Sequence, residues 1–267
     1  MRDRLKTSVP PLGKPNDPMK PIRLVLALTV MPLALGLAAC GKKNDAAVVA
    51  DTALAKVSPP AGKQWSDVIS PTADGGYLMG NPDAPLKLIE YGALSCSHCA
   101  AFSTEGFPKL RDDYVNSGRI SYELRFFMLN PLDVPAVLLA TCGNPPETVI
   151  PMAEQYWAWQ PTMFANLKAA GQDAMQRVQA LPANQRPAVI ARLTGMNDFF
   201  AQRGIATGQG AQCLTDTSRA TSLAAQTQKA QTDFNVTGTP AFILNGRNLE
   251  VANWDGLEPL LQKAGAR

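Results

Sequence analysis

Two residue types suited to thiol chemistry come together in one tetrapeptide, Cys96-Ser97-His98-Cys99. It holds the single histidine of the chain and two of its five cysteines. Exchange between thiols and disulfides needs a nucleophilic sulfur, a second sulfur that resolves the mixed disulfide, and a group that favours the thiolate. The tetrapeptide contains all three, so it predicts a redox-active dithiol.

Two cysteines at this spacing can also supply half of a zinc site. However, the sequence has no second Cys-X-X-Cys, and its histidine lies between the two cysteines rather than at a distant ligand position. The remaining cysteines, Cys40, Cys142 and Cys213, are scattered singly. The sequence therefore favours redox chemistry over zinc, and we expect neither a metal nor a cofactor.

A strand and a helix are expected to hold the dithiol. Residues 86–91 are mostly apolar, which indicates a strand that leads through Gly92 into the first cysteine. Apolar side chains then recur at roughly helical spacing, at Phe102, Phe107, Leu110 and Tyr114. Pro108 should bend this helix. Cys96 is thus predicted at a helix N-terminus, where unpaired N–H groups and the helix dipole stabilise a thiolate.

His98 adds a second cationic or hydrogen-bonding group beside Cys96. Both effects should lower the pKa of the Cys96 thiol below its usual value of about 8.5. A stabilised thiolate makes the disulfide oxidising. Cys99, one turn into the helix, is expected to be more buried and to resolve the mixed disulfide. The alternative for His98 is a surface residue with no part in the chemistry.

The rest of the chain predicts a mixed α/β fold whose last two strands are antiparallel. We expect a strand over 120–129, helices over 131–234, a strand over 241–244, a turn at Asn245-Gly246, a strand over 248–251 and a helix over 255–264. A helical stretch of about 100 residues is too long for a connection, so it is predicted to be an inserted subdomain.

The N-terminal part resembles an export signal. Basic residues precede an apolar run over 24–39, which is short for a membrane span and ends in Leu-Ala-Ala-Cys at Cys40. This resembles the lipobox of bacterial lipoproteins, in which the lipid-modified cysteine becomes the mature N-terminus. An ordinary signal peptide is the alternative. We expect Met19 to be the initiator, a signal peptide over 1–40 and a tether over 41–76.

The cysteine count bears on a second pair. If a lipid takes Cys40, four cysteines remain in an export compartment where disulfides persist. Cys142 and Cys213 are then left for a structural disulfide, which closes a loop of roughly 70 residues. The alternative is two buried free cysteines that act as small apolar residues.

The segment from Ile89 to Cys99, with Thr237-Gly238-Thr239-Pro240-Ala241 far downstream, resembles the DsbA-like branch of the thioredoxin superfamily. Gly80-Asn81-Pro82-Asp83-Ala84-Pro85 and Tyr114-Val115-Asn116-Ser117-Gly118 match as well. The resemblance covers roughly residues 77–265 and implies an α/β thioredoxin fold with a large inserted helical subdomain. Residues 77–130 and 235–267 would form the thioredoxin domain, and residues 131–234 the insertion.

The resemblance also implies roles for residues outside the tetrapeptide. Pro240 would be cis and face the dithiol, and Thr239 would pair with an extended substrate strand. The alternative is a trans Pro240 that begins an edge strand. Glu90 stands six residues before the first cysteine, where a buried acid with a raised pKa would relay the proton of Cys99. A solvated charge at the strand end is the alternative for Glu90.

In one position the chain departs from the family pattern. Ser97 stands where the commonest oxidases of the family have proline, and the dipeptide between the cysteines tunes thiolate stability. The size of the redox potential is therefore left open by the sequence.

The function implied by the resemblance is that of an enzyme of the periplasm or cell envelope that oxidises cysteine pairs in exported proteins, and the motif at Cys40 predicts that a lipid anchors it to a membrane. A membrane partner of the DsbB type or a small oxidant would restore its disulfide. The alternatives are a reductase or isomerase, and a lipoprotein chaperone without turnover. No basic stripe with interleaved aromatic residues follows the N-terminal segment, so no nucleic-acid partner is expected.

Overall fold

A computed structural model of the chain defines residues 52–267. The expected initiator Met19, signal peptide, lipidation site Cys40 and first part of the tether lie outside these residues. None of the helices within 52–267 combines the length and the apolar character needed to cross a bilayer.

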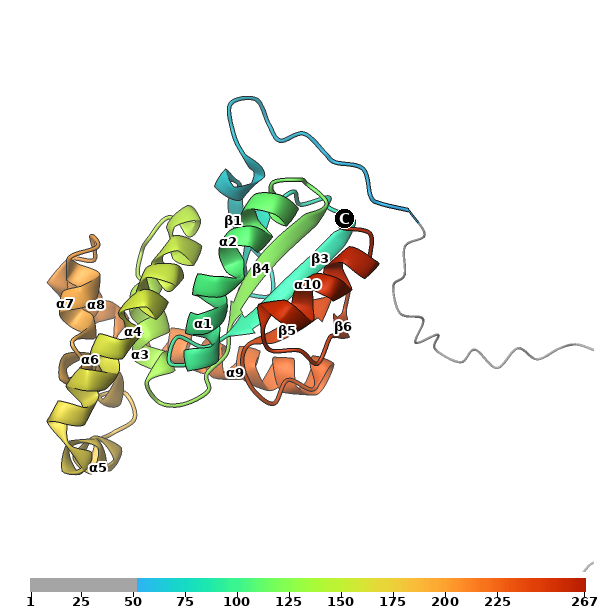
Figure 1. Ribbon diagram of the computed structural model, residues 1–267. Coiled ribbons are helices and arrows are strands. Elements are labelled where there is room, and N and C mark those ends of the chain that lie inside the picture. The colour runs from blue at the N-terminus through green and yellow to red at the C-terminus, as the bar shows by residue number, and fades with distance from the viewer. Residues whose placement is uncertain (1–51) are drawn as a thin grey trace, which may run out of the picture. The chain divides into compact units, whose positions relative to one another are not determined.

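A mixed sheet of six strands lies at the centre of the fold (Figure 1). The strands are β1 (Ile69–Pro71), β2 (Tyr77–Gly80), β3 (Leu86–Gly92), β4 (Ile120–Phe126), β5 (Ala241–Leu244) and β6 (Arg247–Asn248), in the spatial order β1-β2-β4-β3-β5-β6. β3 and β4 are parallel, and every other neighbouring pair is antiparallel. The central strand β3 ends at the dithiol, so the best-buried part of the sheet positions the chemistry.

The prediction of a tether over 41–76 needs a correction, because the folded part of the chain begins before residue 77. A short 3-10 helix, η1 (Trp65–Asp67), and strand β1 precede residue 77, and β1 pairs with β2. Trp65 is buried, and its indole N–H donates to the carbonyl oxygen of Val57 at 2.8 Å. A strand of three residues is too short to show a hydrophobic period, so the sequence pattern did not reveal it.

Two predicted strands are shorter than expected. The strand expected over 120–129 ends at Phe126, because the amide groups of residues 129 and 130 are hydrogen-bonded to the side chain of Asp133 instead. The strand expected over 248–251 is the two-residue β6, since Glu250 has a φ of 56° that extended backbone does not allow. The last helix, α10, spans Trp254–Lys263.

The helix after the dithiol is broken, as Pro108 predicts. α1 (Ser97–Glu105) is followed by the single turn α2 (Phe107–Lys109) and the π-helical segment η2 (Leu110–Val115). Pro108 lies in the first turn of α2, where its missing N–H costs no hydrogen bond. The break falls at Gly106, whose α-carbon lies so close to α10 that a β-carbon there would be 2.6 Å from Cβ of Trp254.

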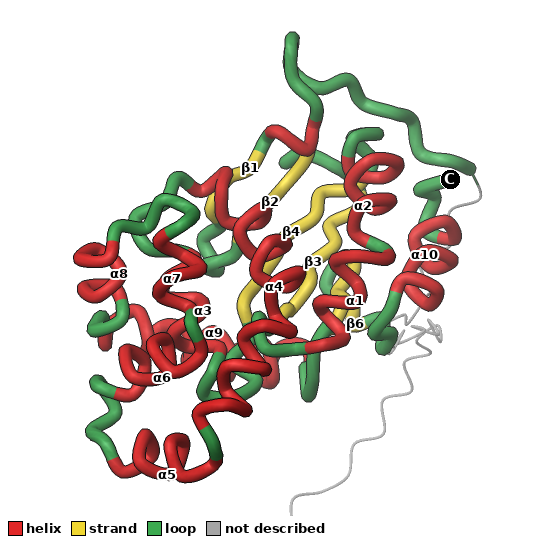
Figure 2. Tube along the Cα trace, turned by 60° about the vertical axis from the view of Figure 1, so that its left-hand side comes forward, coloured by secondary structure: helices red, strands yellow, loops and turns green. Residues whose placement is uncertain are grey.

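Helices cover both faces of the sheet (Figures 1 and 2). α1 and α10 pack on one face, where the ring of Phe102 meets that of Phe242 with centroids 4.8 Å apart. Helix α9 packs on the other face, where Ala230 joins Tyr91 and Ile243. Alternate residues of β3 and β5 therefore face different helices, which explains why both strands are apolar along most of their length.

A helical insertion separates β4 from β5, so the predicted mixed α/β fold with an inserted helical subdomain is confirmed. Its helices are α3 (Asp133–Ala140), η3 (Pro146–Thr148), α4 (Val149–Ala170), α5 (Gln172–Ala180), α6 (Arg186–Thr194), α7 (Met196–Ala201), α8 (Thr207–Cys213) and α9 (Thr217–Phe234). α4 packs against α1 and so links the insertion to the helix that carries the dithiol.

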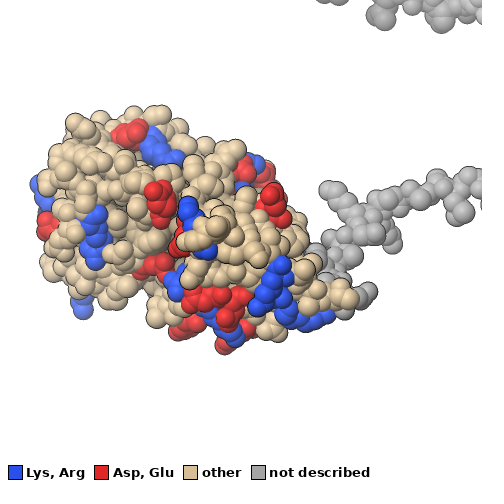
Figure 3. All heavy atoms as spheres, turned by 90° about the horizontal axis from the view of Figure 1, so that it is seen from above, with Lys and Arg blue, Asp and Glu red and all other residues tan. Residues whose placement is uncertain are grey.

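Basic and acidic side chains lie interspersed on the face of the molecule seen in Figure 3. Such an arrangement is typical of a solvated surface.

Candidate active site

The two cysteines of the tetrapeptide lie at the start of α1. Cys96 is the N-cap residue, Cys99 lies in the first turn, and both are free thiols. Cys96 is 5% exposed and Cys99 is fully buried, whereas Ser97 and His98 between them are exposed. One sulfur thus borders the surface while the other lies behind it.

The environment of Cys96 favours its ionised form. Its pKa is lowered to about 5, first by hydrogen bonding from the Cys99 thiol, and this outweighs the opposing effect of burial. The Thr239 side chain and the backbone N–H groups of Cys99 and His98 contribute further hydrogen bonds. The thiolate is therefore stabilised by donors at the helix N-terminus and across the site.

Cys99 has the opposite character. Burial raises its pKa above the ordinary value, and the neighbouring Cys96 and the carboxyl group of Glu90 raise it further. A low pKa at one sulfur and a high pKa at the other separate the roles of the two thiols. The arrangement suits Cys96 for attack and Cys99 for resolution.

The His98 ring is exposed, and within residues 52–267 it makes no hydrogen bond or ion pair. Its contribution to the Cys96 thiolate comes through its backbone N–H. Residue 98 is an exposed position of the first turn of α1. A direct effect of the ring on the thiolate stays a prediction.

Glu90 is completely buried on β3, below the dithiol. Its Oε2 accepts a hydrogen bond of 2.6 Å from the hydroxyl of Tyr122, while Oε1 has no partner among the described residues. Burial raises its pKa to about 8, against the lowering effect of Tyr122, and the charge of Cys96 adds to the rise. A carboxyl group with this pKa can gain or lose a proton near neutral pH.

Thr239 and Pro240 bring the distant end of the chain to the dithiol. The peptide bond between them is cis, and the Cys96 thiol donates to the carbonyl oxygen of Thr239 at 3.1 Å. The Thr239 hydroxyl is buried beside the thiol and contributes to the lowered pKa of Cys96. A groove beside this bond is lined by residues 235–241, 248 and 250–252.

Side chains of the insertion hold the backbone that precedes Cys96. From α4, the indole N–H of Trp157 donates to the carbonyl oxygen of Ala93 at 3.0 Å. The amide of Gln160 donates to the carbonyl oxygens of Leu94 and Cys96 at 2.8 and 3.1 Å. The loop that aims the nucleophile is thus fixed by a helix from another part of the fold.

Asp133, at the start of α3, holds the same loop from the other side. Its buried carboxylate accepts hydrogen bonds from the backbone and hydroxyl of Ser95 at 2.8 and 3.1 Å. The backbone N–H groups of Leu129 and Asn130 also donate to it, at 3.0 Å each. Burial raises the pKa of Asp133 to about 6, although these hydrogen bonds lower it.

The sequence did not point to the side chains Tyr122, Asp133, Trp157 and Gln160. Each acts through tertiary hydrogen bonds and belongs to no short motif. The one local signal is the run Asn130-Pro131-Leu132-Asp133, in which a turn precedes an acidic residue at a helix start. It predicts a helix boundary but gives no indication of a contact with residue 95.

No group of three or more His, Cys, Asp or Glu side chains placed to hold a metal ion is found in residues 52–267. The groups near the dithiol are the carboxyl groups of Glu90 and Asp133 together with backbone and hydroxyl groups.

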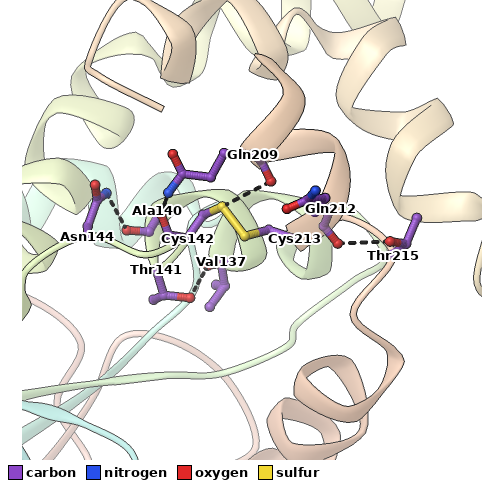
Figure 4. Close-up of a disulfide and its surroundings, with 9 residues drawn as sticks. All are labelled: Val137, Ala140, Thr141, Cys142, Asn144, Gln209, Gln212, Cys213 and Thr215. Atoms are coloured by element: carbon purple, nitrogen blue, oxygen red, sulfur yellow. Dashed lines mark hydrogen bonds between the residues drawn. A yellow bond between two sulfur atoms is a disulfide. The ribbon is translucent and has the colours of Figure 1, made fainter. Parts of the chain in front are cut away.

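Cys142 and Cys213 form a disulfide inside the insertion, at the ends of α3 and α8 (Figure 4). Their Cα atoms are 5.8 Å apart, and 71 positions separate them in the chain. Gln209 donates from its side chain to the carbonyl oxygen of Cys142 at 2.9 Å, next to the sulfur bridge. This disulfide is distinct from the free thiols of the active site.

The family model of thioredoxin matches residues 72–263. A putative protein-disulfide oxidoreductase of Rickettsia prowazekii is 25% identical over 191 residues, which are 72% of this chain and 62% of the relative. The chain therefore spans less than two thirds of the length of that relative. Disulfide bond formation protein D of Bacillus subtilis is 31% identical over 62 residues, 22% of this chain and 28% of the relative.

Solved structures agree with this assignment. The protein-disulfide isomerase from Novosphingobium aromaticivorans is 31% identical with a TM-score of 0.68, over 72% of this chain and 97% of that one. The Wolbachia pipientis alpha-DsbA1 shares the fold at 20% identity and a TM-score of 0.56, over 70% and 89% of the two chains. The chain belongs to the thioredoxin family.

Proposed function

We propose that the chain is an enzyme of the cell envelope that oxidises cysteine pairs in exported proteins. The observation that carries this proposal is the contrast between the two thiols: Cys96 borders the surface with a pKa of about 5, and Cys99 is buried with a raised pKa. Stabilising the Cys96 thiolate favours the reduced dithiol, and this makes the disulfide form a stronger oxidant.

The reaction begins with the disulfide form. A substrate thiolate attacks the Cys96 sulfur, the Cys96–Cys99 bond breaks, and its electron pair goes to the Cys99 sulfur, which takes up a proton. The second substrate thiolate then attacks the substrate sulfur that is bonded to Cys96 in the mixed disulfide. Cys96 leaves as a thiolate, a good leaving group because of its low pKa. The substrate gains a disulfide, and the enzyme is left reduced.

Two further features fit this reaction. Glu90, buried with a pKa of about 8, is suited to hand the proton to Cys99. The groove beside the cis bond of Thr239 and Pro240 offers backbone groups for an extended substrate segment, with the Cys96 sulfur 3.1 Å from the Thr239 carbonyl oxygen.

We extend the proposal to the location and partners of the enzyme. The export signal and the Cys40 motif support a lipid anchor in the envelope, and exported proteins with cysteine pairs are then the substrates. A membrane protein of the DsbB type or a small oxidant would accept the electrons and restore the disulfide.

The test uses the purified full chain and a reduced, unfolded protein with two cysteines. With oxidised glutathione as the oxidant, the wild type should introduce the disulfide and Cys96→Ser should abolish this activity. In Cys99→Ser, Cys96 first forms a mixed disulfide with glutathione; a substrate thiolate then attacks the Cys96 sulfur and releases reduced glutathione, and mass spectrometry should detect the mixed disulfide with the substrate. If Cys96→Ser formed disulfides as well as the wild type and assisted folding equally, the chaperone alternative would replace this proposal.

Isomerisation is the second candidate, because the solved structure at 31% identity is described as a protein-disulfide isomerase. Scrambled and reduced forms of one substrate distinguish the two reactions. An oxidase restores the native disulfides of the reduced substrate much faster than those of the scrambled substrate. An isomerase restores the native disulfides of the scrambled substrate while its own dithiol is reduced.

A further inference from the structure

Tyr122 is the one side chain in residues 52–267 that hydrogen-bonds to Glu90, through a contact of 2.6 Å with Oε2. The register of the parallel strands explains this contact. Glu90 of β3 pairs with Leu124 of β4, and Tyr122 lies two residues earlier on the same face as the diagonal neighbour. Both side chains are buried, with exposed fractions of 0% and 1%.

Within residues 52–267, no cation is among the groups that chiefly act on this buried pair. The titratable groups that act on Glu90 or Tyr122 are Cys96 and Cys99 from α1 and Glu154 from α4, all of which carry negative charge when ionised. Within the described residues, the Tyr122 O–H is therefore the single donor that stabilises a carboxylate on Glu90. A hydrogen bond to a buried charged group is among the stronger kinds.

The other carboxyl oxygen, Oε1, borders the segment that leads to the dithiol. A β-carbon placed on Gly92 would lie 3.2 Å from Oε1. The next residue, Ala93, contributes a backbone hydrogen bond that favours the ionised form of Cys99. Oε1 of Glu90 and the sulfur of Cys99 thus flank the same two-residue segment, and Oε1 has no partner of its own among the described residues.

We propose that Tyr122 is a positioning residue for the proton relay: its hydroxyl holds Oε2 of Glu90 and leaves Oε1 as the atom that exchanges a proton with Cys99. This inference rests on the proposed function of the dithiol. When the Cys96–Cys99 bond opens, the electron pair on the Cys99 sulfur takes the proton from Oε1. The Tyr122 hydroxyl stabilises the carboxylate that remains, and a proton from solvent later restores the acid.

The expected consequence is a shift in pH dependence. In the opening of the disulfide by a dithiol peptide, Glu90 must be protonated, so the rate divided by the peptide's thiolate fraction should fall at the pH where Glu90 ionises. Tyr122→Phe removes the donor and raises the pKa of Glu90, so this fall should move to higher pH by about one unit. Glu90→Gln should lack the fall altogether.

Tyr156→Phe is the matched control. Tyr156 is another fully buried tyrosine, packed against Trp159, Phe199 and Phe200 in the core of the insertion, and its hydroxyl has no partner among the described residues. Its pH profile should coincide with that of the wild type. A Tyr122→Phe profile that coincides with the wild type, in a protein with native circular dichroism, would overturn the inference.

A measurement on the wild type decides the question if Tyr122→Phe does not fold. In the chain labelled with ¹³C at tyrosine Cζ and glutamate Cδ, the Tyr122 signal should shift at the same pH as the Glu90 carboxyl signal. Independent titration of the two signals would contradict the inference. Absence of any thiol-disulfide turnover in the wild type would instead contradict the proposed function, and the two failures are therefore distinguishable.

Discussion

At the scale of single residues, the active site combines two sulfurs and one carboxyl group whose pKa values are displaced in different directions. The cause for Cys96 is hydrogen bonding at a helix N-terminus, and the cause for Cys99 and Glu90 is burial. The two cysteines were predicted from a local motif, a Cys-X-X-Cys after a strand, whereas the role of Glu90 was implied by the resemblance to a known family. Tyr122 escaped prediction because its contact depends on the register of two strands.

The displaced pKa of Glu90 predicts a pH-dependent stability. Its pKa is about 8 in the folded chain and about 4.3 in an unfolded chain. The folded state keeps the proton that the unfolded state releases, so the Glu90 contribution is present below pH 4 and is lost as the pH rises to 8. The lowered pKa of Cys96 acts in the opposite direction, but it is common to wild type and variant and cancels in their difference.

Glu90→Gln should therefore gain stability relative to the wild type by about 1.5 kcal/mol between pH 6.5 and pH 8. This window lies above the pKa of about 6 at Asp133, the other buried carboxyl group of the site, which limits its influence. Urea unfolding of both reduced proteins at the two pH values measures the difference. A constant difference would show that Glu90 ionises normally in the folded state.

At the scale of elements, the active site is a loop between β3 and α1 that α3 and α4 hold by hydrogen bonds. The strand, the helix start and the insertion itself follow from hydrophobic period, proline and glycine positions. The hydrogen bonds of Gln160 and Asp133 do not follow, because these residues lie 64 and 38 positions from their partners Cys96 and Ser95. Strand β1 was also missed, since three residues carry too little pattern.

Replacing Gln160 tests how far this loop depends on the insertion. Gln160→Leu keeps the volume of the side chain but leaves the carbonyl oxygen of Leu94 buried without its donor. The free energy of unfolding should fall by about 1–3 kcal/mol. The pKa of Cys96, followed by thiolate absorbance at 240 nm, should rise because the loop that aligns its donors is loosened.

Gln155→Leu is the control for this experiment, because Gln155 is an exposed residue of the same helix. Its effect on stability should be within about 0.5 kcal/mol, and its Cys96 thiolate should titrate as in the wild type. Equal effects of the two variants on the Cys96 titration would mean that Gln160 does not position the loop.

At the scale of the whole molecule, the helical insertion has a covalent cross-link of its own, the disulfide between Cys142 and Cys213. Within the insertion, Cys142 lies just after α3 and Cys213 is the last residue of α8, whereas the reactive thiols lie at the junction of β3 and α1. The chain thus separates a structural sulfur pair from a reactive one. Counting cysteines suggested this pairing, but only the fold brings the two residues, 71 positions apart, into contact.

Removing both sulfurs with Cys142→Ala and Cys213→Ala should lower the free energy of unfolding by about 4 kcal/mol, because the unfolded chain regains the entropy of a loop of this length. Guanidinium unfolding under non-reducing conditions measures the loss. The rate at which the folded double variant oxidises a dithiol peptide should equal that of the wild type. A large loss of rate in the folded variant would show that the bridge also supports the active site.

The central claim concerns the direction in which the dithiol passes electrons, and the reduction potential of the Cys96–Cys99 pair tests it most directly. The full chain is equilibrated with mixtures of reduced and oxidised glutathione, and its oxidised fraction is determined by thiol alkylation and mass spectrometry. Stabilisation of the Cys96 thiolate predicts a potential above about −180 mV, in the range of strong disulfide donors. A potential near −270 mV, that of thioredoxin, would contradict the account and make the protein a reductase.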